Sequence, residues 1–160
     1  MKKLTLVFFI IGLMALFAQE IHACSCAMPE VAEAYDEART VFIGEVTRIV
    51  KPRTYDPNAP LADRLYQVTF KVEKSWKGLA TFLPEVTVLS NQNLDAACTW
   101  GDFVKGEKYL VYAEGTPEKD LAVLFSCNRT TSLADATEDL KMLEGKGRFT
   151  FDFTNPEGKQ

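Results

Sequence analysis

Histidine is nearly absent from this sequence: its 160 residues include only His22. That residue lies in an N-terminal segment typical of a secretory signal peptide, so we expect the mature chain to contain none. A chain without histidine cannot run a Ser-His-Asp or Cys-His mechanism, and it cannot build the His-based zinc sites of metallohydrolases. No pair of carboxylates stands out for acid–base catalysis. We therefore expect that the protein is not an enzyme and that it needs no cofactor.

Basic residues are also few, with 18 Lys and Arg against 22 Asp and Glu and a net charge of −4. Phosphate neutralisation needs a basic face, so this balance argues against a nucleic-acid partner. Apolar residues make up 47% and charged residues 25%, which is close to a globular average. The length accommodates one domain with a tail.

The longest apolar run is too short to span a bilayer. It covers residues 4–17 behind Lys2 and Lys3, whereas a transmembrane helix needs about 20 apolar residues. Ala23 then precedes Cys24, at a position suited to signal-peptide cleavage. We expect a secreted or periplasmic protein with no membrane span after cleavage.

The chain is accordingly divided into a signal peptide at 1–23, a domain at 24–145 and a tail at 146–160. Two alternatives remain open for the first segment. It could be retained as an anchor, or Cys24 could be lipidated, because residues 21–24 loosely resemble a lipobox. Lipidation would leave an odd number of cysteines in an oxidising compartment.

The four cysteines are Cys24, Cys26, Cys98 and Cys127, and export places them where disulfides persist. A bond between Cys24 and Cys26 would be strained. Two pairings remain: Cys24–Cys98 with Cys26–Cys127, or the crossed alternative. Either one attaches the new N-terminus to two distant parts of the chain. The sequence has no Cys-x-x-Cys spacing, so structural disulfides are favoured over a zinc site.

Hydrophobic periodicity predicts five strands and two helices. The expected strands cover residues 40–50, 65–76, 86–89, 108–113 and 121–127. One helix is expected over 29–39, beginning at Pro29, and a second is capped by Ser132 and ended by Gly145. Short strands separated by turn signals predict an all-β fold, a five-stranded antiparallel barrel with two flanking helices.

Loop signals and a short tail account for the remaining residues. Prolines and Asn58 predict a loop over 51–64, and residues 91–106 have an irregular pattern. In the tail, Phe149, Phe151 and Phe153 alternate. This pattern indicates an added edge strand, or a partly ordered tail whose phenylalanines cover a core edge.

Several segments together resemble one known family. They are Cys24-Ser25-Cys26, residues 40–46, residues 74–78, Ala97-Cys98, residues 109–111 and Cys127, which falls on the last expected strand. In their order and spacing they resemble the N-terminal domain of the tissue inhibitors of metalloproteinases and, more broadly, the netrin-like modules. The match covers about residues 24 to 143.

The resemblance implies an OB-type barrel with a disulfide-stapled N-terminus, paired as Cys24–Cys98 and Cys26–Cys127. It also implies a mechanism. The free α-amino group and the carbonyl oxygen of Cys24 would chelate the catalytic zinc of a partner metalloprotease and displace its water. The only metal involved would be the zinc of that protease.

The resemblance further implies which residues contact the protease. Ser25, next to Cys26, would enter the first primed-side pocket, and Ala27 and Met28 would run along the cleft. A neighbouring ridge would consist of Ala96, Ala97, Cys98 and Thr99. The loop at 51–64 matches a variable loop that can add contacts.

Two departures from the animal inhibitors are evident. Their third disulfide is missing, with Asp36 nearest its first cysteine, and no second cysteine-rich domain follows. We therefore keep two expectations. The first is a monomeric inhibitor of a zinc metalloprotease. The alternative is an exported netrin-like module that binds another extracytoplasmic protein and inhibits nothing.

Overall fold

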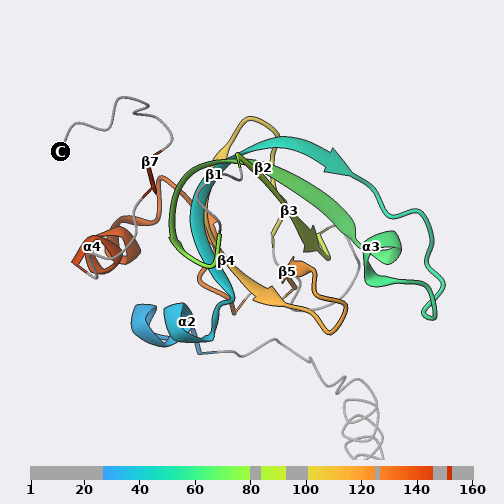
Figure 1. Ribbon diagram of the computed structural model, residues 1–160, viewed down its shortest axis with the longest axis horizontal. Coiled ribbons are helices and arrows are strands. Elements are labelled where there is room, and N and C mark those ends of the chain that lie inside the picture. Colours follow the sequence, from blue (N-terminus) through green and yellow to red (C-terminus); the bar gives the residue numbers. More distant parts are fainter. Residues whose placement is uncertain (1–26, 80–83, 93–100, 125–126, 146–150, 153–160) are drawn as a thin grey trace, which may run out of the picture.

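The computed structural model describes residues 27–79, 84–92, 101–124, 127–145 and 151–152 (Figure 1). Five strands close into a barrel. They are β1 (Thr40–Val50), β2 (Tyr66–Lys77), β3 (Glu85–Ser90), β4 (Lys108–Gly115) and β5 (Leu121–Val123). Their order around the barrel is β1-β2-β3-β5-β4, and β4 pairs with β1 to close the ring. The predicted five-stranded barrel is confirmed at this level.

The barrel is mixed, so the prediction of a purely antiparallel barrel was wrong. Strands β3 and β5 run parallel, with Leu89 opposite Ala122 and Ser90 opposite Val123. The other four pairs of the ring are antiparallel. A closed ring with an odd number of strands cannot alternate direction at every junction. One parallel pair is therefore required by the strand count itself.

Three short helices and two short strands complete the described chain: α2 (Val31–Glu37), α3 (Leu61–Arg64), α4 (Thr137–Gly145), β6 (Thr131–Ser132) and β7 (Phe151–Asp152). The two predicted helices correspond to α2 and α4, and α3 is an additional turn within the expected loop. Strand β7 pairs with β2, which supports the edge strand predicted in the tail. Phe149 and Phe153 lie outside the described residues.

Both helices begin later than predicted. Helix α2 starts at Val31 with Glu30 as N-cap, whose carbonyl oxygen accepts the Ala34 N–H at 2.9 Å, so Pro29 lies outside the helix. Ser132 does not cap α4. It pairs with β4 as part of β6, and its hydroxyl donates to the carboxylate of Asp135 at 2.7 Å. Ser132 and Asp135 thus bind each other ahead of the helix, which begins only at Thr137.

The barrel interior is filled by alternating residues of all five strands and by Phe103, which precedes β4. The buried residues are Phe42, Val46, Val68, Phe70, Val72, Val88, Phe103, Tyr109, Val111, Ala113 and Val123. The rings of Phe70 and Phe103 meet edge to face, with centroids 5.2 Å apart. The alternation along β2 that predicted a half-buried strand is confirmed by this core.

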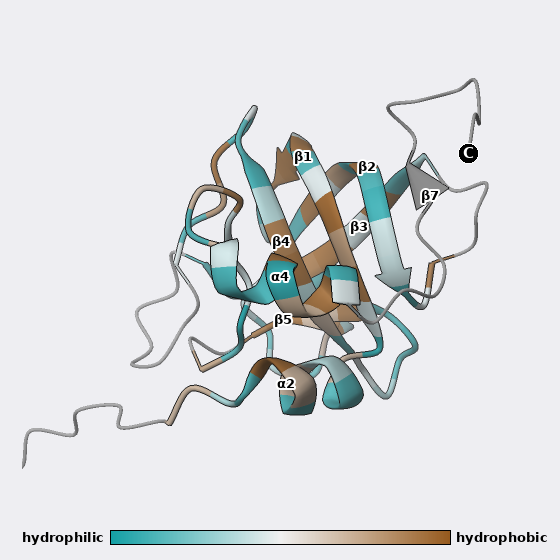
Figure 2. Ribbon diagram, turned by 90° about the vertical axis from the view of Figure 1, so that its left-hand side faces the viewer, coloured by the Kyte–Doolittle hydropathy of each residue, from teal (hydrophilic) through white to brown (hydrophobic). Residues whose placement is uncertain are grey.

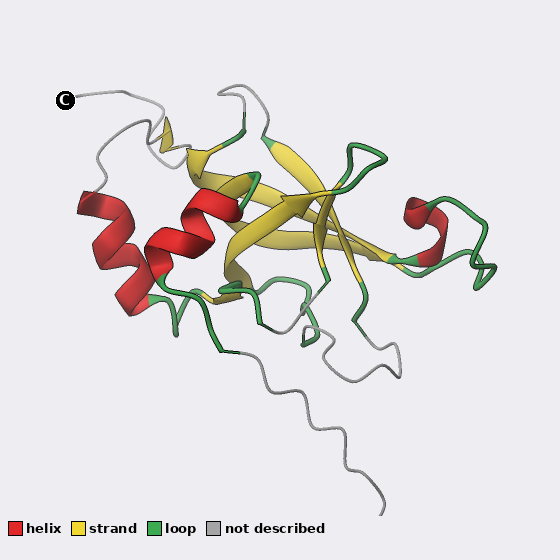
Figure 3. Ribbon diagram, turned by 90° about the horizontal axis from the view of Figure 1, so that it is seen from below, coloured by secondary structure: helices red, strands yellow, loops and turns green. Residues whose placement is uncertain are grey.

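A second core lies between the outer face of the barrel and the helices. Figure 2 shows α4 in front of β1 and β4, with α2 beside it. Val41 and Ile43 of β1 and Leu110 and Tyr112 of β4 are buried under this layer, together with Leu143. Strand β4 is thus buried on both faces, which explains its continuous apolar run. From below, α2 and α4 lie at one end of the molecule and α3 at the other (Figure 3).

The end of β2 anchors α2 to the barrel. The Lys77 ammonium donates to the carbonyl oxygens of Tyr35 (2.7 Å) and Asp36 (2.9 Å) at the end of that helix. The Tyr35 hydroxyl donates in turn to the carbonyl oxygen of Trp76 at 3.1 Å. Cations are favourable at helix C-termini, where backbone carbonyls lack partners. Trp76 and Lys77 therefore hold the helix that follows the N-terminal segment. Within the described ranges, no helix is both long and apolar enough to cross a membrane.

Candidate functional site

Most residues of the predicted protease-binding edge lie outside the described residues. These are Cys24, Ser25, Cys26, Ala96, Ala97, Cys98 and Thr99. Ala27 and Met28 are described, and both are exposed, Met28 by 56%. The structure thus describes the C-terminal end of the predicted contact segment.

Cys127 is disulfide-bonded, and it is the only cysteine of the described ranges. Its partner is therefore one of three cysteines outside those ranges, and the predicted pairing stays a prediction. Cys127 occupies a turn, whereas β5 ends at Val123. The prediction that Cys127 lies on the last barrel strand was wrong, because β5 pairs for only three residues before the chain leaves the barrel.

The chain just after Cys127 holds the N-terminal segment. Arg129 Nη1 donates to the carbonyl oxygen of Pro29 at 3.0 Å. The same guanidinium binds Asp139 of α4 through two parallel hydrogen bonds, Nε to Oδ1 at 2.8 Å and Nη2 to Oδ2 at 2.7 Å. A third contact joins Nη2 to Glu138 at 3.1 Å. One side chain therefore links the segment beside Met28 to the last helix.

Asp139 is buried and connects this arginine to the barrel wall. Its side chain is 5% exposed, and its Oδ1 also accepts the hydroxyl of Tyr112 at 2.8 Å. Burial of Tyr112 and its hydrogen bond to Asp139 raise the pKa of that hydroxyl above its usual value, so it acts as a neutral donor. The hydrogen bonds to Asp139 likewise raise the pKa of Arg129, which stays charged. We call Arg129, Asp139, Tyr112 and the Pro29 carbonyl the Arg129 cluster.

Residues 128–130 are fixed against β4 by their own hydrogen bonds. The Asn128 amide nitrogen donates to the carbonyl oxygen of Tyr112 at 2.6 Å, and its oxygen accepts the Thr130 N–H at 2.7 Å. The Tyr112 N–H donates to the Thr130 hydroxyl at 2.9 Å. These hydrogen bonds fix the two residues that flank Arg129, and so they fix the position from which its side chain extends.

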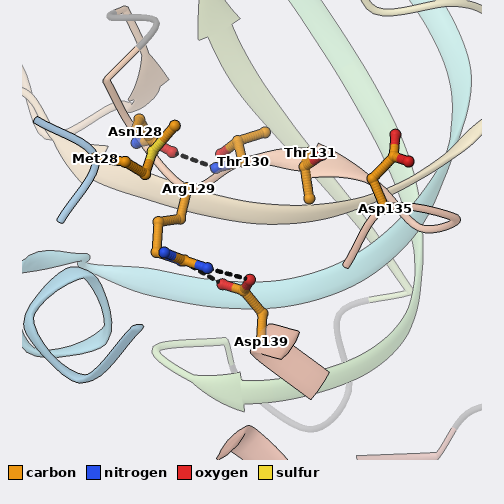
Figure 4. A pocket seen from close by; sticks show the side chains of 7 residues that line it. All are labelled: Met28, Asn128, Arg129, Thr130, Thr131, Asp135 and Asp139. Carbon is orange, nitrogen blue, oxygen red and sulfur yellow. Dashed lines mark hydrogen bonds and ion pairs between the residues drawn. The ribbon is translucent and has the colours of Figure 1, made fainter. Parts of the chain in front are cut away.

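A shallow pocket of about 200 Å³ lies over the cluster (Figure 4). It is lined by Met28, Asn128, Arg129, Thr130, Thr131, Asp135 and Asp139. Figure 4 shows the guanidinium turned toward the Asp139 carboxylate, with Met28 beside Asn128. The exposed thioether thus lies next to a polar surface formed by the chain after Cys127.

The predicted variable loop lies at the other end of the molecule. Its N–H groups at Arg53 and Thr54 donate to the Asp63 carbonyl oxygen at 2.7 and 3.2 Å, which closes the loop onto α3. Tyr55 is 79% exposed in this closed loop. The structure therefore does not bring this loop beside Met28.

The sequence did not identify the Arg129 cluster. One signal was available: Asp139 falls on the apolar face formed by Ala136, Leu140 and Leu143, where a charge needs a partner. No local pattern relates that carboxylate to Arg129 or to Pro29, since only the closed barrel brings them together.

In the described part of the chain, no group of three or more His, Cys, Asp or Glu side chains could hold a metal ion.

No protein-family model matches the sequence, and no curated protein matches it.

Proposed function

We propose that the protein is an exported inhibitor of zinc metalloproteases that acts through the free N-terminus of Cys24. The proposal combines the order of the four cysteines with one observation. The N-terminal segment is bound at Pro29 by Arg129, two residues beyond the disulfide-bonded Cys127. A segment that must enter a protease cleft benefits from being held before docking, because less entropy is then lost on binding.

The chemistry of the proposed contact is simple. An α-amine and the carbonyl oxygen of the same residue close a five-membered ring on a metal ion. An α-amino pKa of about 7.7–8.0 leaves a neutral fraction at neutral pH, and metal binding releases the remaining proton. The amine would occupy the position of the water that attacks the substrate.

The barrel supports the same family resemblance. The OB-type fold is a five-stranded, partly open barrel, and this chain has a five-stranded ring with two helices over β1 and β4. We infer from the resemblance that the barrel is OB-type and that the N-terminus is stapled by Cys24–Cys98 and Cys26–Cys127. Met28 would then line the protease cleft, and Ala96 to Thr99 would form the adjacent ridge.

The first experiment is an intact mass of the processed protein from an exporting host. The proposal requires a chain of residues 24–160 lacking four hydrogens, which has a free Cys24 amine and two disulfides. A lipid adduct, or a start at another residue, would remove the chelating group and refute the proposal.

The second experiment extends the N-terminus by one alanine. The extended and unextended proteins should unfold at the same denaturant concentration, because the extra residue precedes the domain. Inhibition of a zinc metalloprotease should fall by at least a hundredfold, since the amine no longer belongs to Cys24. Equal inhibition by the two proteins would refute chelation.

An exported netrin-like binding module is the second candidate. The observation that favours it is Tyr55, which is 79% exposed in an ordered loop remote from α2. A binding surface there needs no free N-terminus. Such a module would bind its partner equally well with and without the added alanine, and neither form would inhibit a protease.

A further inference from the structure

The Arg129 side chain binds the backbone of the segment that contains Met28, directly at the next residue. Its Nη1 donates to the Pro29 carbonyl oxygen at 3.0 Å, three residues after Cys26 and five after Cys24. Pro29 has no N–H of its own, so its carbonyl is the one backbone group by which this residue can be held. The contact is long-range, because one hundred positions separate the two residues.

The guanidinium is itself immobilised. Two parallel hydrogen bonds to Asp139 fix its plane, and the buried carboxylate is held by the Tyr112 hydroxyl at 2.8 Å. A planar fork held at two nitrogens directs its third nitrogen, Nη1, in a set direction. The Arg129 side chain is only 14% exposed, so little water competes for this geometry.

We propose that Arg129 is a positioning residue that holds the N-terminal segment in place through the Pro29 carbonyl. It joins the segment to α4 and to the barrel wall without a covalent bond. Its effect on inhibition rests on the proposed function, whereas its effect on the order of Ala27 and Met28 does not.

Charge and geometry can be separated at this position. Arg129→Lys keeps a cation for Asp139, but an ammonium is a compact point charge and cannot reach the carboxylate and the Pro29 carbonyl together. The variant should therefore keep most of the ion pair and release the segment. Thr40→Val is the matched control. It removes another buried hydrogen bond, from the Thr40 hydroxyl to the Lys77 carbonyl oxygen at 2.7 Å, without touching the cluster.

The first measurement is the ¹⁵N order parameter of the Ala27 amide in the processed, disulfide-bonded protein. We expect a value near that of rigid backbone, about 0.85, in the wild type and in Thr40→Val. In Arg129→Lys we expect a value below about 0.6. An unchanged Ala27 order parameter in Arg129→Lys would overturn the proposal.

The second measurement is the inhibition constant against a zinc metalloprotease that the wild type inhibits. Arg129→Lys should weaken inhibition about tenfold or more, mainly through faster dissociation, and Thr40→Val should leave it unchanged. Equal weakening by both variants would show a general stability effect and overturn the positioning role. If the wild type inhibits no metalloprotease, the proposed function fails, and the Ala27 order parameter alone decides whether Arg129 holds the segment.

Discussion

At Gly78 the chain leaves β2 with φ of +79°, and the structure leaves no space there for a side chain. A Cβ would lie 2.2 Å from the carbonyl oxygen of Arg39, which is backbone and cannot move aside cheaply. Gly106 has φ of +88°, but a Cβ there would meet nothing within 4 Å. Comparing alanine substitutions at the two glycines therefore distinguishes the cost of the backbone conformation from the cost of steric overlap.

We predict that Gly78→Ala destabilises the protein by more than about 3 kcal/mol. The left-handed conformation alone costs about 1 to 2 kcal/mol for a residue with a Cβ, and the overlap with Arg39 adds to it. Gly106→Ala should cost only the conformational part. Urea unfolding of both variants measures the difference, and equal losses would contradict the role of the Arg39 contact.

The buried hydroxyl of Tyr112 gives stability a dependence on alkaline pH. Its folded-state pKa is raised by burial first and by Asp139 second. An unfolded tyrosine ionises near pH 10, so this contribution is intact below that pH and is lost as the pH rises above it. There the unfolded state binds fewer protons than the native state, so the free energy of unfolding falls with pH.

We predict that this single group lowers the free energy of unfolding by about 1 kcal/mol between pH 10 and 11, and by about 1.4 kcal/mol per pH unit above that. Tyr112→Phe should lose about 1.5 to 3 kcal/mol at pH 7, because a hydrogen bond to the Asp139 carboxylate is removed. It should also show a shallower decline between pH 10 and 11. Denaturant titrations at several pH values test this, and parallel declines for the two proteins would show that Tyr112 is not responsible.

At the scale of single elements, helix α4 covers the outer faces of β1 and β4 with few apolar residues. Leu143 is fully buried in that layer, whereas its neighbour Met142 is 39% exposed. The helix has nine residues, too few to be stable alone in water, so its packing decides whether it forms.

We predict that Leu143→Ala costs about 2 to 5 kcal/mol, because it removes a buried side chain and leaves a cavity. Met142→Ala should cost under about 1 kcal/mol. Both variants keep helix propensity high, so the comparison isolates packing. Urea unfolding followed by circular dichroism provides the measurement. Similar losses would mean that α4 is not docked through Leu143.

Local patterns predicted the strands in which apolar and polar residues alternate or β-branched residues are frequent. Strand β1 matches its predicted bounds, Thr40–Val50, and β2 differs by one residue at each end. Elements that depend on distant partners were missed or shifted. Strand β6 exists because Thr131 and Ser132 pair with β4, and that pairing moves the start of α4 to Thr137. The residues near 131 and 132 do not reveal this pairing, because its partner strand β4 is distant in the sequence.

The candidate site was predictable only in part for the same reason. Ala27 and Met28 are exposed, and their role as protease contacts stays a prediction. The Arg129 cluster joins residues 29, 112, 129 and 139, which meet only when β4, α4 and the N-terminal segment are assembled. Asp139 was the one visible sign, as a carboxylate on an apolar helix face.

At the scale of the whole molecule, the ring of strands and the disulfides constrain the chain in different ways. The barrel closes through hydrogen bonds between β4 and β1 and between β3 and β5. Disulfides act mainly on the unfolded chain, by limiting the conformations open to it. Cys127 is disulfide-bonded, so one loop of the chain is closed by a cysteine just before the Arg129 cluster.

A double-mutant cycle identifies its partner. We predict that Cys26→Ser and Cys127→Ser each cost about 4 to 5 kcal/mol, as expected for a loop of about 100 residues. The double variant should cost no more than either single variant, because the same bond is lost only once. Unfolding is measured in mildly acidic, non-reducing buffer, where thiolate exchange is slow. The crossed pairing would give the opposite result. The Cys26→Ser, Cys127→Ser double variant would then lose about twice the stability of either single variant, and the Cys24→Ser, Cys127→Ser double variant would lose no more than a single variant. Cys24 would then be joined directly to the chain beside Arg129, and Cys26 to Cys98.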